Sequence, residues 1–268
     1  MTRRTLVVFH AHPDDEAIAT AGSMAKAASE GHRVVLVVAT RGEQGEVAEG
    51  YLEPGEALWE RRVKETSAAA QALGVARVAF LGYVDSGMMG TPENELPESF
   101  WQADVEEAAG RLAAILEEEH ADVLTAYDEN GVYGHPDHIQ VHRVGLRAGE
   151  LARTPKVYQS TIDRDRVRQL VAAAREQAEQ AGTDLPGDID PEEFNVGVSG
   201  HLITTRVDVS QFIDRKREAM AAHASQISAD SFFLAMPPEQ FAVAFGEEDY
   251  ILCGAPPGTA ETDLFEGL

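Results

Sequence analysis

Short apolar runs rich in Val, Leu and Ile alternate along the chain with longer segments in which apolar and polar residues recur at helical spacing. The short runs are typical of strands buried on both faces, and the longer segments predict amphipathic helices. The predicted strands are 5–10, 33–39, 75–81, 123–126, 156–161, 202–209 and 250–253. The predicted helices are 16–30, 58–73, 100–119, 136–151, 163–181 and 211–224. This alternation predicts a Rossmann-like α/β fold, a mostly parallel sheet with helices on both faces.

One domain is expected over 1–268, with a smaller C-terminal portion after the repeated strand–helix units. The alternation is weakest over 162–200, where a highly charged helical segment leads into a turn-rich acidic stretch. We interpret 162–200 as an insertion or mobile segment. The residues from Pro256 onward are expected to form an extended tail.

Two long irregular loops, 41–57 and 82–99, directly follow predicted strands. In open α/β sheets the ligand crevice lies beyond the carboxyl ends of the strands. Long loops at that edge usually serve a function. Both loops are therefore expected to border a ligand site.

Composition excludes several classes of partner. The 268 residues include 46 acidic and 22 basic side chains, so the formal net charge is −24. Such a surface repels nucleic acid and anionic membranes, and neither is expected as a partner. Nothing resembles a signal peptide, and no apolar run approaches the roughly 18 residues that span a bilayer. The single cysteine, Cys253, is expected to be a buried thiol, and the lack of disulfides favours the cytoplasm.

Two clusters of metal-ligating residue types follow predicted strands. Residues 10–16 read HAHPDDE after the first strand, and residues 135–138 read HPDH in the loop after the fourth. A single His-Pro-Asp is often no more than a helix cap. Because both strands belong to one parallel sheet, however, the two clusters are expected at the same edge, and the pair favours metal binding.

Three of these side chains, His12, Asp15 and His138, can supply the ligands of a catalytic zinc. Such a zinc keeps an open position for water and lowers the pKa of that water to roughly 7. Asp14 stands beside this set and can take the proton from the water. Iron(II) accepts the same two-His, one-carboxylate set, so the residues alone leave the metal open.

The second cluster and its neighbour Tyr133 offer candidates for the general acid and for the groups that stabilise the oxyanion. His135, as an imidazolium, can stabilise the oxyanion or protonate the leaving amine. Asp137 is expected to hold the His135 ring in one tautomer and to raise its pKa. Tyr133 can add a hydrogen bond to the oxyanion.

The paired motifs resemble those of the PIG-L/LmbE superfamily of zinc-dependent N-deacetylases, and the resemblance covers most of the chain except 162–200. It implies a Rossmann-like sheet and one zinc per chain on the three ligands named above. It further implies Asp14 as the general base, and His135 as general acid or oxyanion partner, oriented by Asp137.

Within the superfamily the chain resembles the mycothiol branch, which includes a deacetylase of N-acetylglucosaminyl-inositol and an amidase of mycothiol S-conjugates. Tyr133 matches the active-site tyrosine of this branch. Arg62 resembles its substrate-binding arginine, and Asp85 its sugar-binding aspartate. The stretch 222–226, which reads AHASQ, is similar to another that these enzymes share.

Some residues of the chain resemble the deacetylase of this branch, and others resemble the amidase. Gly134 resembles the deacetylase, as does Ala19 where the amidase carries a lysine, whereas 128–131 and 203–208 resemble the amidase. The favoured interpretation is hydrolysis of an N-acetyl amide on a small, glucosamine-type sugar. The alternatives are a thiol-conjugate amide, another N-acyl amino sugar, and a sugar-binding module with structural zinc. The last is disfavoured because structural zinc sites usually have four protein ligands. The oligomeric state is left open.

Overall fold

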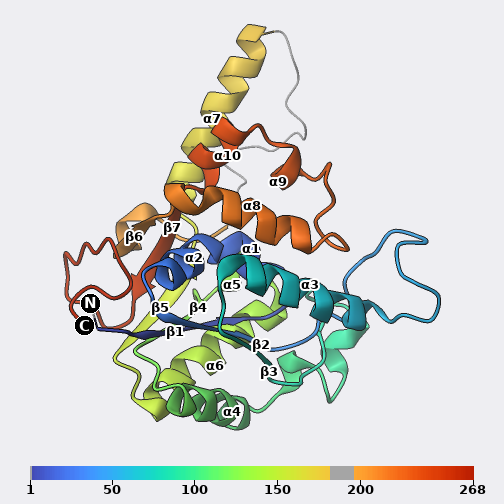
Figure 1. Cartoon of the computed structure of the whole chain (residues 1–268), viewed down its shortest axis with the longest axis vertical. Coiled ribbons are helices and arrows are strands. Elements are labelled where there is room, and N and C mark those ends of the chain that lie inside the picture. The colour runs from blue at the N-terminus through green and yellow to red at the C-terminus, as the bar shows by residue number, and fades with distance from the viewer. Residues whose placement is uncertain (1, 182–195) are drawn as a thin grey trace.

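The computed structural model describes residues 2–181 and 196–268 (Figure 1). Its centre is a seven-stranded sheet in the order β3-β2-β1-β4-β5-β7-β6. The strands are β1 (Thr5–His10), β2 (Arg33–Val38), β3 (Arg77–Phe80), β4 (Val123–Tyr127), β5 (Lys156–Thr161), β6 (Thr205–Asp208) and β7 (Glu247–Leu252). The first five strands run parallel, and β7 pairs antiparallel with both β5 and β6. The predicted mostly parallel sheet is confirmed.

The strand order reverses between β1 and β4. From β1 the chain moves outward through β2 to β3, and then returns to place β4 on the other side of β1. Leu6 of β1 is level with both Val34 of β2 and Val123 of β4. The loops after β1 and β4 therefore leave the same edge side by side, where open α/β sheets bind their ligands.

Helices cover both faces of the sheet (Figure 1) because alternate strand residues point to opposite sides. In β1, Leu6 and Val8 belong to one buried core and Val7 and Phe9 to the other. The first core is covered by α2 (Ala21–Ser29), α3 (Leu58–Leu73) and α8 (Ile213–Ala222). The second is covered by α4 (Val105–Glu118) and α6 (Pro136–Ala152). Burying each such aliphatic side chain stabilises the fold by about 1.5–3 kcal/mol.

The remaining helices are α1 (Asp15–Ala19), α5 (Gly131–Gly134), α7 (Arg164–Ala181), α9 (Phe232–Ala235) and α10 (Pro238–Phe245). Short 3-10 turns lie at Pro92–Glu95, Phe100–Gln102, Gly200–Leu202 and Ser210–Phe212. The single helix predicted over 16–30 is split at Thr20, whose φ of −134° is not helical. The helix predicted over 100–119 begins only at Val105, because the Asp104 carboxylate caps it by accepting from the Glu107 N–H.

The segment 162–200, predicted as an insertion, begins with α7, which projects beyond the sheet in Figure 1. Residues 182–195 lie outside the described part of the chain, and for them the expectation stays a prediction. Where the described chain resumes, the Val198 N–H donates to the Ile162 carbonyl at 3.0 Å. The two ends of the segment thus meet beside β5.

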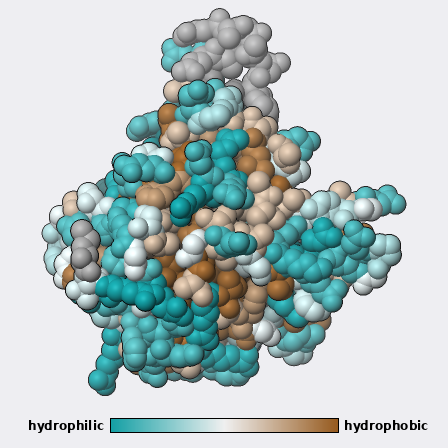
Figure 2. Space-filling view, viewed as in Figure 1, coloured by the Kyte–Doolittle hydropathy of each residue, from teal (hydrophilic) through white to brown (hydrophobic). Residues whose placement is uncertain are grey.

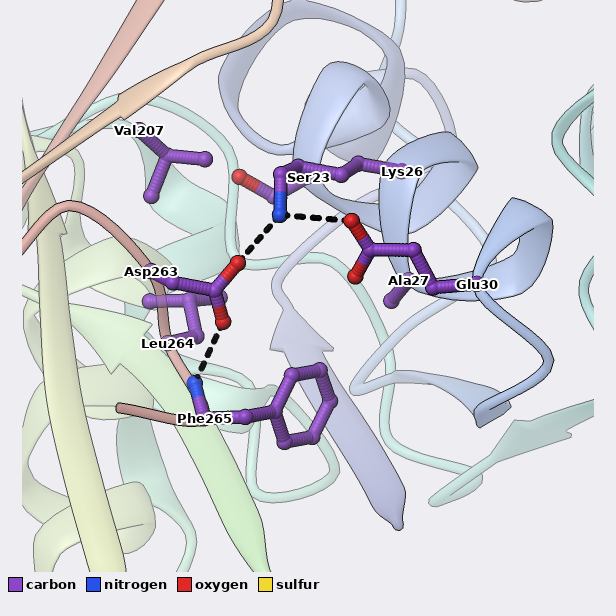
Figure 3. A pocket seen from close by; sticks show the side chains of 8 residues that line it. All are labelled: Ser23, Lys26, Ala27, Glu30, Val207, Asp263, Leu264 and Phe265. Atoms are coloured by element: carbon purple, nitrogen blue, oxygen red, sulfur yellow. Dashed lines mark hydrogen bonds and ion pairs between the residues drawn. The ribbon is translucent and has the colours of Figure 1, made fainter. Parts of the chain in front are cut away.

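The prediction of an extended tail from Pro256 onward is wrong. Leu264 is 3% exposed and packs in the first core. Figure 3 shows Lys26 of α2 directed at Asp263 in a small hollow between this helix and the C-terminal segment. Glu261 accepts hydrogen bonds from two side chains of β5 at 2.7 and 2.6 Å. Acidic side chains that meet distant partners hold this segment, and such pairing leaves no periodic pattern in the sequence.

The surface reflects the composition. Figure 2 shows hydrophilic side chains over much of one face, with hydrophobic ones gathered toward the middle of the view. Within the described residues, no helix combines the length and the apolar character that a bilayer span requires. Cys253 is only partly buried, against expectation, and burial raises the pKa of its thiol. A thiol with a raised pKa is a poor nucleophile.

Candidate metal and catalytic site

The two sequence motifs meet at a cavity of about 230 Å³ at the edge where the strand order reverses. The loops after β1, β2, β3 and β4 all contribute to its lining. Seven of the nine predicted site residues line it, together with Gln44, Gly45 and Met88. The other two, Asp137 and His138, are 0% and 3% exposed and do not reach the lining.

Asp15 lies between two histidines. Its Oδ2 is 3.5 Å from His12 Nδ1, and its Oδ1 is 3.4 Å from His138 Nε2. Ligand atoms of a tetrahedral metal with bonds of about 2.0–2.1 Å lie about 3.3–3.4 Å apart. The Asp15 carboxylate is therefore close to a ring nitrogen of each histidine, one at each oxygen, and the ligand set of His12, Asp15 and His138 stays a prediction.

The His138 ring is a separate observation that bears on the ligand set. Both of its ring nitrogens are buried, and neither has a hydrogen-bond partner within the part of the chain that the structure describes. Unpaired buried polar atoms are rare in folded proteins. The Tyr127 ring stacks on it with centroids 4.6 Å apart and so fixes its orientation. A metal ion would satisfy one of the two nitrogens.

Among the residues that the structure describes, two sets of three donors have ligand atoms within 4.8 Å of one another, and the predicted set is not one of them. They are His12 with His135 and His138, and His12 with Asp85 and Asp137. The first is weakened because His135 Nδ1 already accepts from the Asp137 N–H at 3.1 Å. In the second, both carboxylates face Nε2 of His12, away from Asp15.

The Asp137 carboxylate does not make the expected contact with His135. Its Oδ2 lies 3.0 Å from His12 Nε2 instead. Ser86 holds it from behind, because the Ser86 N–H donates to Oδ2 at 2.9 Å and the Ser86 hydroxyl donates to Oδ1. A carboxylate on the remote nitrogen of a ligating histidine fixes the tautomer and strengthens the ligand. Asp137 therefore orients His12 and leaves its Nδ1 free for a metal.

The main chain of Asp137, rather than its side chain, sets the tautomer of His135. Since His135 Nδ1 accepts the Asp137 N–H, a neutral ring carries its proton on Nε2. Burial, with the neighbouring His12 and His138, lowers the pKa of His135 to about 4. The ring is thus neutral at pH 7 and suits a hydrogen-bond donor better than the expected imidazolium. Tyr133, 50% exposed, lines the cavity beside it.

Asp14 has the properties of a base held under strain. Its φ of 105° is in the left-handed region, which residues other than glycine rarely adopt. Arg62 Nη2 lies 3.3 Å from its Oδ2. Burial raises the pKa of Asp14 to about 6, and the Arg62 charge opposes the rise. A carboxylate with a pKa near neutrality can both accept and return a proton.

The two predicted sugar-binding residues line the cavity and also tie its loops together. Arg62, 3% exposed, donates to the carbonyl oxygens of Pro13 at 2.6 Å and Gly42 at 2.8 Å. Gly42 must stay a glycine, because its φ is +68° and a Cβ would lie 2.1 Å from Arg62 Nη1. Asp85, 4% exposed, accepts from the Gln44 N–H at 3.2 Å.

Three residues that received no role from the sequence support the predicted set: Ser86 and Glu16 contact it directly, and His223 contacts Glu16. Glu16 is the last residue of the first motif, and His223 lies in the stretch that resembles the mycothiol branch. The sequence therefore pointed to both residues but gave neither a role. Ser86 follows Asp85 in a loop already expected to border the site. Nothing in its own pattern pointed to the Asp137 carboxylate.

Comparisons with known proteins show which family the chain resembles. The family model described as PIG-L: GlcNAc-PI de-N-acetylase matches residues 7–149. A 1D-myo-inositol 2-acetamido-2-deoxy-alpha-D-glucopyranoside deacetylase of Acidothermus cellulolyticus is 41% identical over 280 residues. That alignment covers 99% of this chain and 95% of the relative.

Solved structures show a similar fold. The N,N'-diacetylchitobiose deacetylase from Pyrococcus horikoshii matches with a TM-score of 0.60 and 23% identity, over 95% of this chain and 84% of that one. The 4-carboxy-2-hydroxymuconate hydratase GalB from Pseudomonas putida KT2440 matches with a TM-score of 0.58 and 17% identity, over 94% and 97%. Since a hydratase shares the fold, the fold alone does not set the reaction.

Proposed function

The chain belongs to the PIG-L family and is a deacetylase, and from this premise we propose that it removes the acetyl group of N-acetylglucosaminyl-inositol or a related glycoside, with zinc as its metal. The observation that carries the proposal is the meeting of the two motifs. Loops from neighbouring parallel strands bring His12, Asp15 and His138 together beside a strained acidic residue, Asp14. The relative's identity over nearly its whole length supports the substrate.

Bound zinc would polarise the amide carbonyl and lower the pKa of water to roughly 7. Asp14 accepts the proton of the attacking water. The Nε2–H of neutral His135 donates to the carbonyl oxygen as negative charge develops there, and Tyr133 stands at the open side of the cavity to add a second donor. The proton on Asp14 then passes to the nitrogen as the C–N bond breaks, which leaves acetate and a free amine.

We assign the sugar hydroxyls to Arg62 and Asp85, since both line the cavity beside Asp14. The cavity of about 230 Å³ is smaller than the roughly 300–1,000 Å³ of pockets that enclose drug-sized ligands. This size supports a small N-acetyl sugar over a bulky conjugate. The single cysteine supports a cytoplasmic location.

A comparison of two substrates tests the proposed specificity. Zinc-loaded protein is given N-acetylglucosaminyl-inositol or a mycothiol S-conjugate, and the released amine is followed for both. Because the cavity suits a small acyl group, kcat/KM is expected to be at least about tenfold higher for the N-acetyl sugar, a difference of about 1.4 kcal/mol in transition-state binding. The reverse order would assign the chain to the amidase side of its branch.

Ser86→Ala is expected to weaken zinc binding, because the Asp137 carboxylate behind His12 loses a donor. Removing an outer partner of a metal ligand typically costs roughly 10–100-fold in affinity. Competition with a chromophoric chelator measures the dissociation constant. Ser99→Ala is the matched control, since this hydroxyl is also fully buried but has no hydrogen-bond partner among the described residues. Equal affinities in the two variants would exclude Ser86 from the metal site.

A further inference from the structure

The segment 222–226 takes no part in the chemistry described above, yet it reaches the first motif from the far end of the chain. His223 ends α8 and is 0% exposed. Its Nε2 lies 2.5 Å from Oε1 of Glu16, which is also 0% exposed. Nδ1 of the same ring has no hydrogen-bond partner in the described structure. The ring is therefore anchored by a single polar contact.

The second carboxylate oxygen of Glu16 contacts the main chain of Asp14, the proposed base. Glu16 Oε2 accepts the main-chain N–H of Asp14 at 3.0 Å. Asp14 is the residue with the left-handed φ of 105°. Such a conformation persists only where surrounding contacts hold it in place. Glu16 supplies one of these contacts, and Glu16 is itself held by His223.

Hydrogen bonds from the residues next to His223 hold the segment 222–226 in place. Ser225 donates to the Glu65 carboxylate of α3 through its N–H at 2.9 Å and its hydroxyl at 2.6 Å. Gln226 Nε2 donates to the carbonyl of Glu46, in the loop over the cavity, at 3.1 Å. The segment is thus fixed both to α3 and to the loop that contributes Gln44 and Gly45 to the cavity lining.

We propose that His223 is a positioning residue for the base, acting through Glu16 on the main chain of Asp14. The inference rests on the proposed function, because it takes Asp14 as the group that accepts the proton. Removing the His223 contact frees the Glu16 carboxylate to turn, and the Asp14 main chain then loses an acceptor. Misplacing a catalytic group by about 1 Å can cost on the order of 10²-fold in rate.

Another buried pair on α8 provides a matched control. Lys216 Nζ lies 2.6 Å from Glu248 Oε1, and the two side chains are 1% and 3% exposed. Glu248 also accepts from the N–H groups of Gly22 and Ser23 in α2, so this pair joins α8 to α2 rather than to Asp14. Lys216→Met therefore reports the loss of a buried ion pair from the same helix without the link to the base.

The test compares His223→Leu, His223→Gln and Lys216→Met by kcat, KM, zinc content and melting temperature. His223→Leu is expected to lose roughly 10–100-fold in kcat with KM and zinc content unchanged. His223→Gln keeps a donor toward Glu16 and should recover most of the rate. Lys216→Met should melt earlier and keep its kcat. Equal kcat in His223→Leu and the unchanged protein, or an equal loss in Lys216→Met, would overturn the proposal.

Amide hydrogen exchange at Asp14 gives a readout that needs no substrate. In zinc-loaded protein, exchange is expected to be faster in His223→Leu and unchanged in Lys216→Met, because only the first weakens the acceptor of that N–H. Unchanged exchange in both variants would refute the positioning role even if the enzyme is active. Faster exchange in a protein without deacetylase activity would keep the positioning role and refute the proposed function. Should His223→Leu not fold, Glu16→Gln weakens the same link with its volume kept.

Discussion

Asp14→Asn is expected to lower kcat by roughly 10²–10⁴-fold while the protein keeps one zinc per chain. The amide has nearly the shape of the carboxylate, but it cannot accept the proton of the attacking water. Zinc should remain because Asp15, not Asp14, faces both His12 and His138. Steady-state rates with elemental analysis of the same samples measure both quantities.

A neighbouring acidic residue provides the control for this substitution. Glu43 is a partly buried carboxylate of the cavity loops that does not line the cavity. It pairs with Arg41 at 3.0 Å and accepts the Asp85 N–H at 3.1 Å, and a glutamine keeps an oxygen for that N–H. Glu43→Gln removes one negative charge close to the site, and we expect it to change kcat by less than about tenfold, since it takes no proton in the reaction. Full activity of Asp14→Asn with zinc in place would show that another group is the base.

His138→Ala is expected to lose zinc and activity together. The substitution removes one of three protein ligands, so the loss of affinity should exceed the roughly 10–100-fold typical of outer partners. The Tyr127 ring stacks on this imidazole, and among the described residues neither of its nitrogens has a hydrogen-bond partner, as we expect of a side chain that holds an ion. Zinc per chain after dialysis, with the melting temperature, measures the effect.

His142→Ala is the control, because His142 lies one turn later on α6, and its Nδ1 contacts the Tyr127 carbonyl at 3.0 Å. It should keep its zinc. If His138→Ala retained a full complement of zinc, the ion would have to sit on a different donor set. The group of His12, Asp85 and Asp137 would then be the first alternative, since it does not use His138.

Much of the fold was predictable because its strands are buried on both faces. Such strands appear as unbroken apolar runs, and α3 and β5 have the bounds that the sequence predicted. The short helices α9 and α10 were missed, because neither is long enough to show a clear period. The antiparallel position of β7 between β5 and β6 depends on pairing across the whole chain, which no local pattern contains.

The site was predictable where its residues follow strands and not where loops fold over it. The first motif begins at the end of β1, and the second follows β4 after a short loop and α5, so their meeting follows from the parallel order. The contact of Asp137 with His12 depends instead on Ser86, which the loop after β3 brings in. The support of Asp14 by Glu16 and His223 joins residues 207 positions apart. Spacing within a motif carries no information about such contacts.

Acetate release from N-acetylglucosaminyl-inositol should be measured first, on protein stripped of metal with a chelator and then given zinc in steps. We expect no release from the stripped protein, a circular dichroism spectrum that still shows the folded chain, and activity that returns in full at one zinc per chain. N-acetylglucosamine alone should react more slowly, because it lacks the inositol. Release that survives removal of the metal, or a stripped protein that unfolds, would contradict a catalytic zinc on His12, Asp15 and His138.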